Sequence, residues 1–314
     1  MQTISVATMK AILANGYGDA GVLSFEDAPP PSPGEGEVLV RVCAASVNPV
    51  DWKIRSGARQ KDFPLKLPVI LGKDVSGVVR AVGRNIRSFK PGDRVLALTD
   101  ATYAELVVVA GSILTHLPDG LDLVDSAAIP LVTLTGEQLV RLAARAQPGQ
   151  TILVSGALGS VGRSAVHAAK KLGLKVIAGV RSKQLPEAQT LGIADVVAID
   201  DDASIAGLER VDCVADTVGG ETAAKLFGRV KNGGNFGYAS MLPDGVTERN
   251  PTVTVTRVLG RPDASKVREF ADDIRDGKFL LPISRRLPLR DASEAHVLAQ
   301  RGGAGKIVLV CRDI

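Results

Sequence analysis

The chain has 314 residues, which is long for one compact domain and favours two. Its 45% hydrophobic and 23% charged residues are typical of a globular protein with large buried cores, and they exclude a disordered chain. The net charge of +4 is dispersed and only 4% of the residues are aromatic, which disfavours a nucleic-acid-binding surface.

Targeting and membrane signals are not evident in the sequence. No apolar run reaches the length of about 18 to 20 residues that a membrane-spanning helix needs. The first residues do not resemble a secretory signal, and residues 1–8 are predicted to be a short leading extension. The three cysteines, Cys43, Cys213 and Cys311, are too few and too far apart for a disulfide framework or a four-thiolate zinc site. We therefore expect a cytoplasmic protein.

The first part of the chain, residues 1–125, is predicted to be rich in β-strands. Pro-Gly pairs, which favour turns, stand shortly before β-branched apolar runs at residues 33–34 and 91–92. The strands expected here are Lys10–Ala14, Glu37–Ala45, Gly77–Val82 and Ala104–Val109. Few helical patterns interrupt them.

Residues 126–275 instead alternate apolar strands with amphipathic helices. The predicted strands are Thr151–Ser155, Lys175–Val180, Asp195–Ile199, Val211–Ala215 and Asn235–Ala239, and the predicted helices are Val161–Leu172, Gln184–Leu191 and Gly220–Arg229. This alternation indicates an α/β fold with a doubly wound parallel sheet covered on both faces. A last strand, Gly305–Val310, is expected to return to the first domain, which then comprises residues 1–125 and 276–314.

A glycine-rich turn follows the strand at 151–155 and leads directly into a helix. Glycines stand at positions 156, 159 and 162. Backbone amides at such a turn, together with the helix N-terminus, attract the pyrophosphate of a dinucleotide. The spacing G-x-x-G-x-x-G is not the standard one, but the strand before it and the helix after it favour the dinucleotide site over a simple tight turn. The expected cofactor-binding residues here are Gly156, Ala157, Leu158, Gly159, Ser160 and Val161.

The residues after the next strand indicate which dinucleotide binds. An NAD site usually has an acid there for the ribose 2′-hydroxyl. This chain has Arg181, Ser182 and Lys183, and no acid before Glu187. Two cations and a hydroxyl suit the 2′-phosphate of NADP, so the sequence predicts NADPH as the cofactor. The alternative is that the two cations only solvate a loop.

The nicotinamide half of the cofactor is expected at the carboxyl ends of the later strands, where ligands bind in open α/β sheets. Val218 and Gly219 follow one of these strands, and residues 237–240 follow the next. The residues expected to touch the cofactor here are Val218, Gly237, Tyr238 and Ala239.

Taken together, these motifs resemble those of the zinc-independent medium-chain dehydrogenases/reductases, in particular the quinone oxidoreductases (zeta-crystallin-like) and the alkenal/enone reductases. The resemblance extends from Met9 onward, and the residues that carry it are 46–53, 71–77, 89–95, the glycine turn and 305–309. It implies a GroES-like catalytic domain, a Rossmann domain at 126–275, a cleft between them and a homodimer. The run Thr252–Thr256 alternates like a strand and could supply the sheet edge that pairs across that dimer.

The positions that hold zinc in related alcohol dehydrogenases carry other residues in this chain. Those enzymes have a cysteine where this chain has Asn48, and Gly-His-Glu where it has residues 72–74, Gly-Lys-Asp. Its histidines, His116, His167 and His296, lack metal-ligand spacing. We therefore expect no metal site and a reaction that needs none.

Hydride transfer from NADPH to a quinone, or to the activated C=C of an α,β-unsaturated carbonyl, meets this condition. The resemblance places Asn48, Asp51 and Lys53 beside the nicotinamide ribose, where Lys53 could donate to the enolate or hold the cofactor. These residues could instead form a loop network that fixes the domain geometry. Tyr103 is a candidate proton donor, although a packing role is the alternative.

Two further residues are expected at the cofactor because they match the family pattern. Thr135 stands where the family has a cofactor-contacting threonine, but Gly136-Glu137 follows it instead of the usual alanine and aromatic residue. Lys306 belongs to the Gly-Lys-Ile-Val-Leu motif at 305–309.

Two other functions remain open at the level of the sequence. The first is a carbonyl or alcohol oxidoreductase with the same cofactor, against which the missing zinc ligands count. The second is an NADPH-binding crystallin-like or RNA-binding protein with little catalysis. The loops 55–66 and 241–256 are expected to decide the shape of the substrate pocket.

Overall fold

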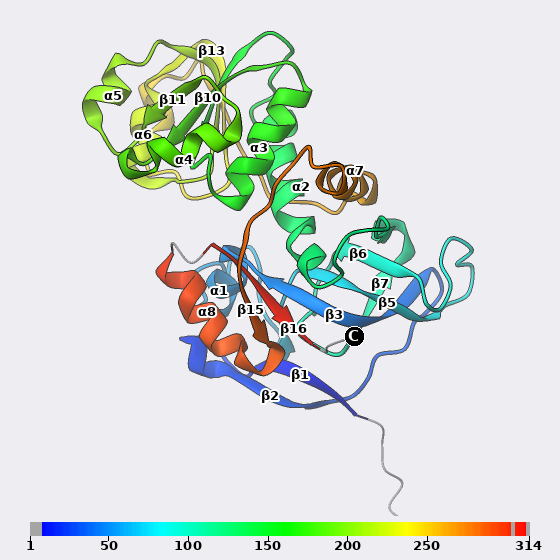
Figure 1. Cartoon of the computed structure of the whole chain (residues 1–314). Coiled ribbons are helices and arrows are strands. Elements are labelled where there is room, and N and C mark those ends of the chain that lie inside the picture. The colour runs from blue at the N-terminus through cyan, green and yellow to red at the C-terminus, as the bar shows by residue number, and fades with distance from the viewer. Residues whose placement is uncertain (1–7, 303–304, 312–314) are drawn as a thin grey trace, which may run out of the picture. The chain divides into compact units, whose positions relative to one another are not determined.

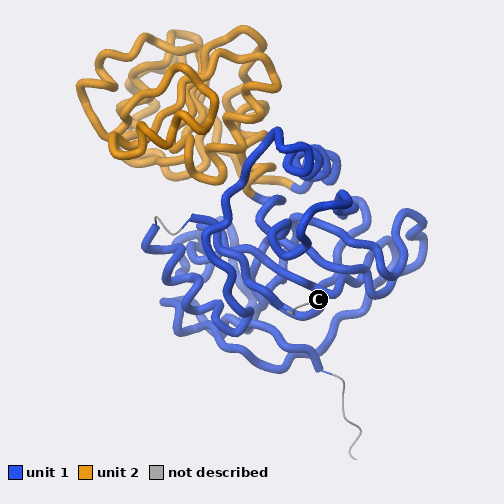
Figure 2. The backbone as a smooth tube through the Cα atoms, viewed as in Figure 1, with its two compact units in different colours: residues 1–131, 262–314 blue, residues 132–261 orange. Residues whose placement is uncertain are grey.

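The computed structural model describes residues 8–302 and 305–311. The expected leading extension therefore lies outside the described residues, apart from its last residue. The chain forms two compact units, one comprising residues 1–131 and 262–314 and the other residues 132–261 (Figure 2). The domain limits predicted from the sequence are 125/126 and 275/276, so the second unit is shorter at both ends than predicted. None of the helices that the structure describes is long and apolar enough to span a membrane.

The first unit contains two sheets (Figure 1). The small sheet has the strand order β2 (Leu23–Ala28), β1 (Met9–Ala14) and β4 (Val69–Ile70). The large sheet has the order β15 (Ile283–Pro288), β16 (Lys306–Val310), β3 (Glu37–Val47), β5 (Asp74–Val82), β6 (Arg94–Leu98) and β8 (Thr115–His116), and β7 (Leu106–Ala110) also pairs with β3.

Strand β3 is the centre of the large sheet. Its residues Val38, Val40 and Val42 alternate toward a core in which their side chains are wholly buried. Along its other edge, Val308 of β16 pairs with Ser46 in antiparallel register. The strand expected at 305–310 therefore does return to the N-terminal part of the chain.

Three helices of the first unit were not predicted from the sequence: α1 (Pro49–Arg55), α7 (Ala264–Arg275) and α8 (Ala292–Arg301). Helix α1 begins with Pro49, whose missing N–H is no loss at a first helical position. Asp263 caps α7 by accepting from the amide of Lys266. Helix α7 packs against β6 and β8, which is why the structure assigns residues 264–275 to this unit.

The second unit is a six-stranded parallel sheet. Its strand order is β11 (Asp195–Ala198), β10 (Lys175–Val180), β9 (Thr151–Ser155), β12 (Val211–Asp216), β13 (Val230–Tyr238) and β14 (Thr254–Arg257). The helices of this unit are α3 (Ser160–Lys171), α4 (Leu185–Ala188), α5 (Asp202–Gly207) and α6 (Gly220–Phe227), and α2 (Pro130–Gln138) leads into it through a π-helical turn, Leu139–Ala143.

Both faces of this sheet are covered, as the apolar strands predicted. Ile152 and Val154 of β9 pack in one core with residues of α3, whereas Leu153 packs with α6 on the opposite face. The expected fold class, a β-rich GroES-like domain with a doubly wound Rossmann sheet, is thus confirmed. The helix expected at 184–191 is shorter, because only α4 is α-helical. A 3₁₀ turn precedes it, and a second 3₁₀ turn follows it and ends at Gly192, which has a positive φ.

Candidate functional site

The glycine turn of the second unit is shaped by close backbone contacts. Gly156 has a φ of +63°, which disfavours any side chain. A Cβ atom at Gly162 would lie 2.1 Å from the carbonyl oxygen of Gly156, so this glycine lets α3 approach the turn. At the exposed Gly159 a Cβ atom would meet only that same oxygen, at 3.3 Å. The backbone at Gly156 and the close contact at Gly162 therefore leave no room for a side chain, whereas Gly159 is exposed.

The glycine turn has the properties of an anion cradle. Helix α3 begins at Ser160, and the first amides of a helix have no partner within it. Leu158, Ser160 and Val161 are half-buried around the turn, and the buried Ala157 donates its amide to Gly179 of β10 at 3.0 Å. The unpartnered first amides of α3 and the positive end of its dipole lie at this turn, so the turn fits a pyrophosphate.

The turn is held by a cation that sequence reasoning did not single out. The guanidinium of Arg163 is buried and donates to the carbonyl oxygen of Leu158 at 3.1 Å and to Glu187 at 3.0 Å. Glu187, the first acid after β10, is thus engaged by Arg163.

The residues after β10 are exposed, as a phosphate-binding loop requires, but they face an acid. Arg181, Ser182 and Lys183 all lie at the surface. The amide and the hydroxyl of Ser182 both donate to one carboxylate oxygen of Asp200, each at 2.7 Å. These bonds lower the pKa of the Asp200 carboxyl below its ordinary value. The sequence signal for Asp200 was its position at the end of the next parallel strand.

A second acid that the sequence reasoning missed organises the carboxyl end of β12. Asp216 is wholly buried, accepts from the Ser155 hydroxyl at 2.6 Å and accepts from the amide of Gly219 at 2.9 Å. Burial raises the pKa of this carboxyl, while the Ser155 bond opposes that shift. Asp216 thereby fixes the turn that carries the exposed Val218.

The other expected cofactor residues of this unit have different surroundings. Tyr238 and Ala239 are half-buried at the end of β13, whereas Gly237 is buried, and a Cβ atom there would lie 2.7 Å from the amide nitrogen of Ala144. Thr135 is half-buried on α2. The roles of these four residues at a cofactor stay predictions.

The unusual residues after Thr135 have a packing explanation. A Cβ atom at Gly136 would lie 2.6 Å from the amide nitrogen of Ala165. Glycine at 136 therefore allows α2 to approach α3. Glu137 in turn pairs with Arg141 one helical turn later.

The first unit holds a buried polar network built on the loop between β3 and α1. Lys306 of β16 donates to the side-chain oxygen of Asn48 at 2.6 Å, and the Asn48 side-chain amide donates to Asp74 at 2.7 Å. Asp74 also accepts from the Ser46 hydroxyl and from the amide of Leu131 at 2.6 Å. All the side chains named here except that of Leu131 are buried. Asn48 is therefore held in one orientation from both ends.

Asp51 and Tyr103 belong to the same network. Asp51 accepts from the backbone N–H of Asn48 at 2.8 Å and from the Tyr103 hydroxyl at 3.1 Å. Burial raises the pKa of the Asp51 carboxyl to about 7 and the pKa of the Tyr103 phenol well above its usual range. The Tyr103 oxygen also lies 3.3 Å from Nε2 of His296, whose pKa burial lowers to about 3. The structure thus joins Asn48, Asp51 and Tyr103, with Asp74 and His296 as members that sequence reasoning missed.

The two lysines expected at the site differ in their surroundings. Lys306 is buried, and burial lowers the pKa of its ammonium, while Asp74 at 3.7 Å favours the charged form. Lys53 is half-buried on α1, and its Nζ lies 5.4 Å from the centre of the Trp52 ring. Partial burial, followed by the nearby Arg59, lowers the pKa of Lys53.

The position that aligns with a zinc-binding histidine is used for an ion pair. Lys73 pairs with Asp100, and its ammonium lies 5.2 Å from the centre of the Phe63 ring. Within residues 8–302 and 305–311, no group of three or more His, Cys, Asp or Glu side chains could hold a metal ion.

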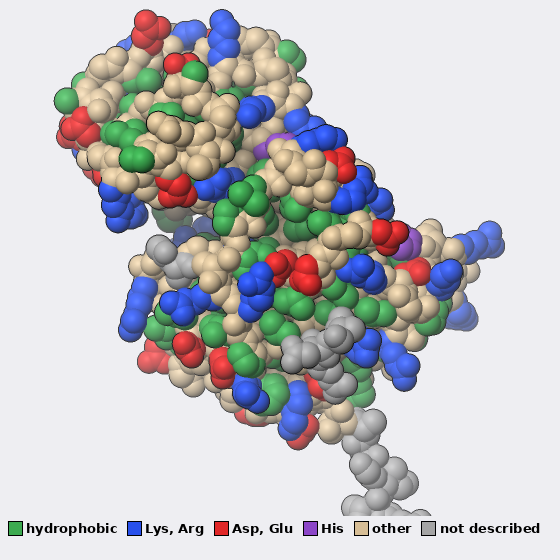
Figure 3. Space-filling model, viewed as in Figure 1, with side chains coloured by type: hydrophobic (Ala, Val, Ile, Leu, Met, Phe, Trp, Pro, Cys, Tyr) green, Lys and Arg blue, Asp and Glu red, His purple; other side chains and the backbone are tan. Residues whose placement is uncertain are grey.

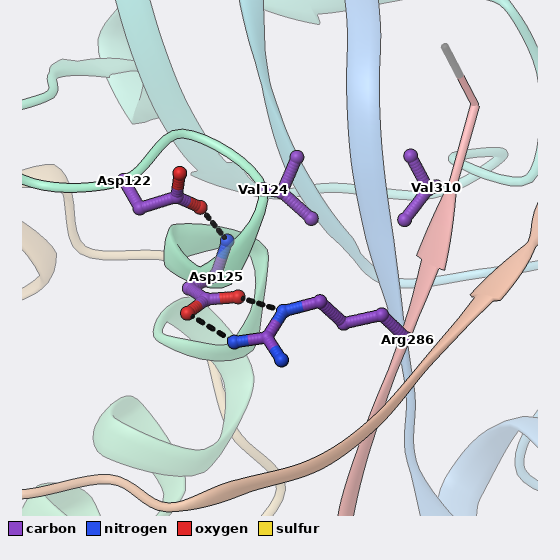
Figure 4. A pocket seen from close by; sticks show the side chains of 5 residues that line it. All are labelled: Asp122, Val124, Asp125, Arg286 and Val310. Carbon is purple, nitrogen blue, oxygen red and sulfur yellow. Dashed lines mark hydrogen bonds and ion pairs between the residues drawn. The ribbon is translucent and has the colours of Figure 1, made fainter. Parts of the chain in front are cut away.

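Other surface features of the first unit do not compete as a site. A pocket of about 550 Å³ is lined by Asp122, Val124, Asp125, Arg286 and Val310. Figure 4 shows these side chains. The cation of this pocket, Arg286, makes two hydrogen bonds of 2.6 Å to Asp125, so its charge is already matched. On the face of the first unit that Figure 3 draws, basic and acidic side chains are interspersed.

Comparisons with known proteins agree with this architecture. The family model of the alcohol dehydrogenase GroES-like domain matches residues 34–119, and that of the zinc-binding dehydrogenases matches residues 191–309. A quinone oxidoreductase of Pseudomonas aeruginosa is 34% identical, with 96% of this chain and 99% of the relative covered.

Solved structures give the same result. The quinone oxidoreductase from Coxiella burnetii has a TM-score of 0.87 at 27% identity and covers 98% of this chain and 100% of its own. A mycobacterial protein complexed with NADPH has a TM-score of 0.83 at 28% identity, with 96% and 99% covered. The chain therefore belongs to the quinone oxidoreductases of the medium-chain dehydrogenase/reductase superfamily.

Proposed function

We propose that this NAD(P)H-dependent oxidoreductase uses NADPH to transfer a hydride to a quinone or to the activated C=C of an α,β-unsaturated carbonyl, without a metal. The observation that carries the proposal is the turn at Gly159, an exposed glycine directly before α3, where the first amides of the helix have no partner within it. Such a turn supplies the one anchor that every dinucleotide shares, its pyrophosphate.

The residues around the cradle support the rest of the cofactor assignment. Arg181 and Lys183 offer two exposed cations to a 2′-phosphate, and the Asp216 turn holds Val218 at the carboxyl end of the sheet. A bound NADPH supplies the hydride from C4 of its nicotinamide. The protein binds and orients the reactants and keeps water away.

The buried network of the first unit is proposed to orient polar groups for the reaction. Lys306 and Asp74 hold the Asn48 amide, and the Asn48 backbone and Tyr103 hold Asp51. Because the Asn48 side chain is buried and bonded at both ends, its proposed role is to hold the loop before α1, and with it Lys53, in a fixed position. Burial raises the pKa of the Asp51 carboxyl to about 7, which favours its protonated form more than for an exposed aspartate.

Lys53 is proposed to donate to the developing enolate or quinol oxygen. Its ammonium lies outside the buried network and is half-exposed. Reduction of a conjugated acceptor moves negative charge to the oxygen, and a positioned cation stabilises that charge. The absence of zinc ligands at Asn48 and Lys73 supports a reaction without a Lewis acid.

The test is a steady-state assay at 340 nm with NADPH or NADH against 1,4-benzoquinone, an alkenal, an enone and a simple aldehyde, each with and without a chelator. We expect turnover of the quinone or enone with NADPH that the chelator does not change. Lys53→Met should lower kcat/KM by about 10-fold or more, whereas Lys278→Met, at an exposed lysine paired with Asp276, should not.

Three outcomes would refute the proposal. Loss of activity on chelation would show that a metal takes part. Tight NADPH binding with no turnover of any acceptor would favour a crystallin-like binding role, while turnover of only the aldehyde would favour a carbonyl oxidoreductase.

The assembly and the location of the protein are proposals as well. We propose a homodimer in which β14, the edge strand of the second unit, pairs with its copy. We also propose that the protein acts in the cytoplasm.

A further inference from the structure

We infer that Asp200 is a cofactor-specificity residue: it competes with the 2′-phosphate of NADPH for Ser182, so that the chain also accepts NADH. This inference rests on the cofactor site proposed above. It concerns the ribose end of that site and assigns a role to a residue outside the glycine turn and the basic loop.

The position of Asp200 follows from the sheet. Strands β10 and β11 are parallel, with Val180 opposite Ala198, and the amide of Ile199 donates to the carbonyl oxygen of Val180 at 2.8 Å. The chain segments that follow the two strands therefore leave the sheet side by side. This places Asp200 next to Ser182, although the two residues are 18 positions apart.

The contact uses both donors of Ser182. Its amide and its hydroxyl each lie 2.7 Å from the same oxygen of Asp200. An amide and a hydroxyl in the turn after this strand are the groups that a 2′-phosphate would need. In the present arrangement both already have an anionic acceptor.

The charges around this contact lead to the same conclusion. Arg181 and Lys183 bring two positive charges, and Asp200 and Asp201 bring two negative charges, so the formal charges of the four residues cancel. The Ser182 bonds, together with the nearby Arg181, lower the pKa of Asp200, which is therefore ionised at neutral pH. A dianionic phosphate at Ser182 would meet this carboxylate, whereas a ribose hydroxyl could donate to it.

Asp201 and Asp202, the neighbouring acids, have other partners. Asp201 caps α5 by accepting from the amide of Ser204 at 2.8 Å. Asp202 pairs with Lys225 at 2.6 Å. Asp200 is thus the acid of this group whose bonds go to the basic loop, and Asp202 offers a matched control for the loss of one negative charge nearby.

The experiment measures binding by calorimetry, with 2′,5′-ADP and 5′-AMP as probes of the adenosine end and with NADPH and NADH as whole cofactors. For the unmodified protein we expect NADPH and NADH to differ in Kd by less than about 10-fold. Asp200→Asn should lower the Kd of 2′,5′-ADP and of NADPH by about 10-fold, which corresponds to one charge-assisted hydrogen bond. It should leave the Kd of 5′-AMP unchanged and the Kd of NADH unchanged or higher. Asp202→Asn should change the Kd of each of the four ligands by less than about 3-fold.

A second variant tests whether the effect passes through Ser182. In the Asp200→Asn background, Ser182→Ala should remove most of the gain for 2′,5′-ADP, because the hydroxyl that the neutral asparagine holds less strongly than the carboxylate did is then missing. Both residues are exposed, so the variants should fold, and circular dichroism checks that they do.

The outcomes separate this inference from the proposed function. If Asp200→Asn changes the ratio of NADPH to NADH affinity no more than Asp202→Asn does, the role of Asp200 is refuted while the cofactor site stands. If the unmodified protein binds none of the four ligands, the proposed cofactor site itself is wrong.

Discussion

Two buried groups of the first unit should give stability contributions of opposite pH dependence, and substitution should separate them. His296 is wholly buried, and burial followed by the nearby Arg55 lowers its pKa from 6.5 to about 3. As the pH falls through about 6.5, this histidine therefore takes up a proton in the unfolded chain but stays neutral in the folded chain. Stability from this group is present above pH 6.5 and is lost as the pH falls, by about 2 kcal/mol between pH 7 and pH 5.

The stability contribution of Asp51 has the opposite pH dependence. Its pKa is raised from 3.8 to about 7, so the folded chain keeps a proton that the unfolded chain releases. Stability from Asp51 is present below pH 3.8 and is lost as the pH rises through 7. Between pH 7 and pH 5 the folded state gains about 2 kcal/mol from this group. The two contributions nearly cancel in the unmodified protein.

The assay is urea unfolding at pH 5, 6 and 7, followed by the fluorescence of the single tryptophan. This residue, Trp52, lies on α1 beside Asp51 and therefore reports on the first unit alone. We expect the free energy of unfolding of His296→Gln to rise by about 2 kcal/mol from pH 7 to pH 5, and that of Asp51→Asn to fall by a similar amount.

The variant pair contains its own control, because both substitutions keep polar side chains of similar size. The free energy of unfolding of the double variant should change little over this pH range. If His296→Gln follows the pH profile of the unmodified protein, the histidine is not held neutral by burial. If both single variants shift in the same direction, the opposing signs argued from the structure are wrong.

Three further outcomes can be measured on the same protein. Gly162→Ala should disrupt the fold of the second unit, since its Cβ atom would lie 2.1 Å from a carbonyl oxygen, whereas Gly159→Ala should leave thermal unfolding unchanged and abolish NADPH binding in calorimetry. Lys306→Met should lower the stability of the first unit by about 3 to 5 kcal/mol in urea, because it leaves a buried carboxylate without its cation. Thr254→Lys, on the edge strand β14, should weaken the proposed dimer in sedimentation experiments, and Asp195→Lys, on the opposite edge, should not.

The second unit could be predicted from the sequence more closely than the first. Strands β9 and β10 were placed at their observed limits because a strand buried on both faces is apolar throughout and ends at turn residues. Helix α1 was missed because its seven residues, which include Pro49 and Trp52, show too little periodicity. Helix α8 follows a strand of exposed arginines, where no buried pattern marks its start.

For the candidate site, local motifs were readable and long-range partners were not. The glycine turn, Asn48 and Asp51 lie in short segments with recognisable spacing. Asp216 bonds Ser155 of β9, and Asp200 bonds Ser182 in the turn after β10, so only the sheet order brings these partners together. Lys306 was expected at the cofactor, and that role stays a prediction, while its observed partner is Asn48.

The return of β16 to the first sheet affects how the chain can fold during synthesis. A ribosome makes residues 132–261 before it makes Lys306–Val310, so the second unit can complete its sheet while the first still lacks a strand beside β3. Until then Asn48 and Asp74 have no ammonium to bind. Residues 1–131 are thus synthesised first but reach their native sheet last. A chain whose synthesis stops before β16 would expose the edge of β3.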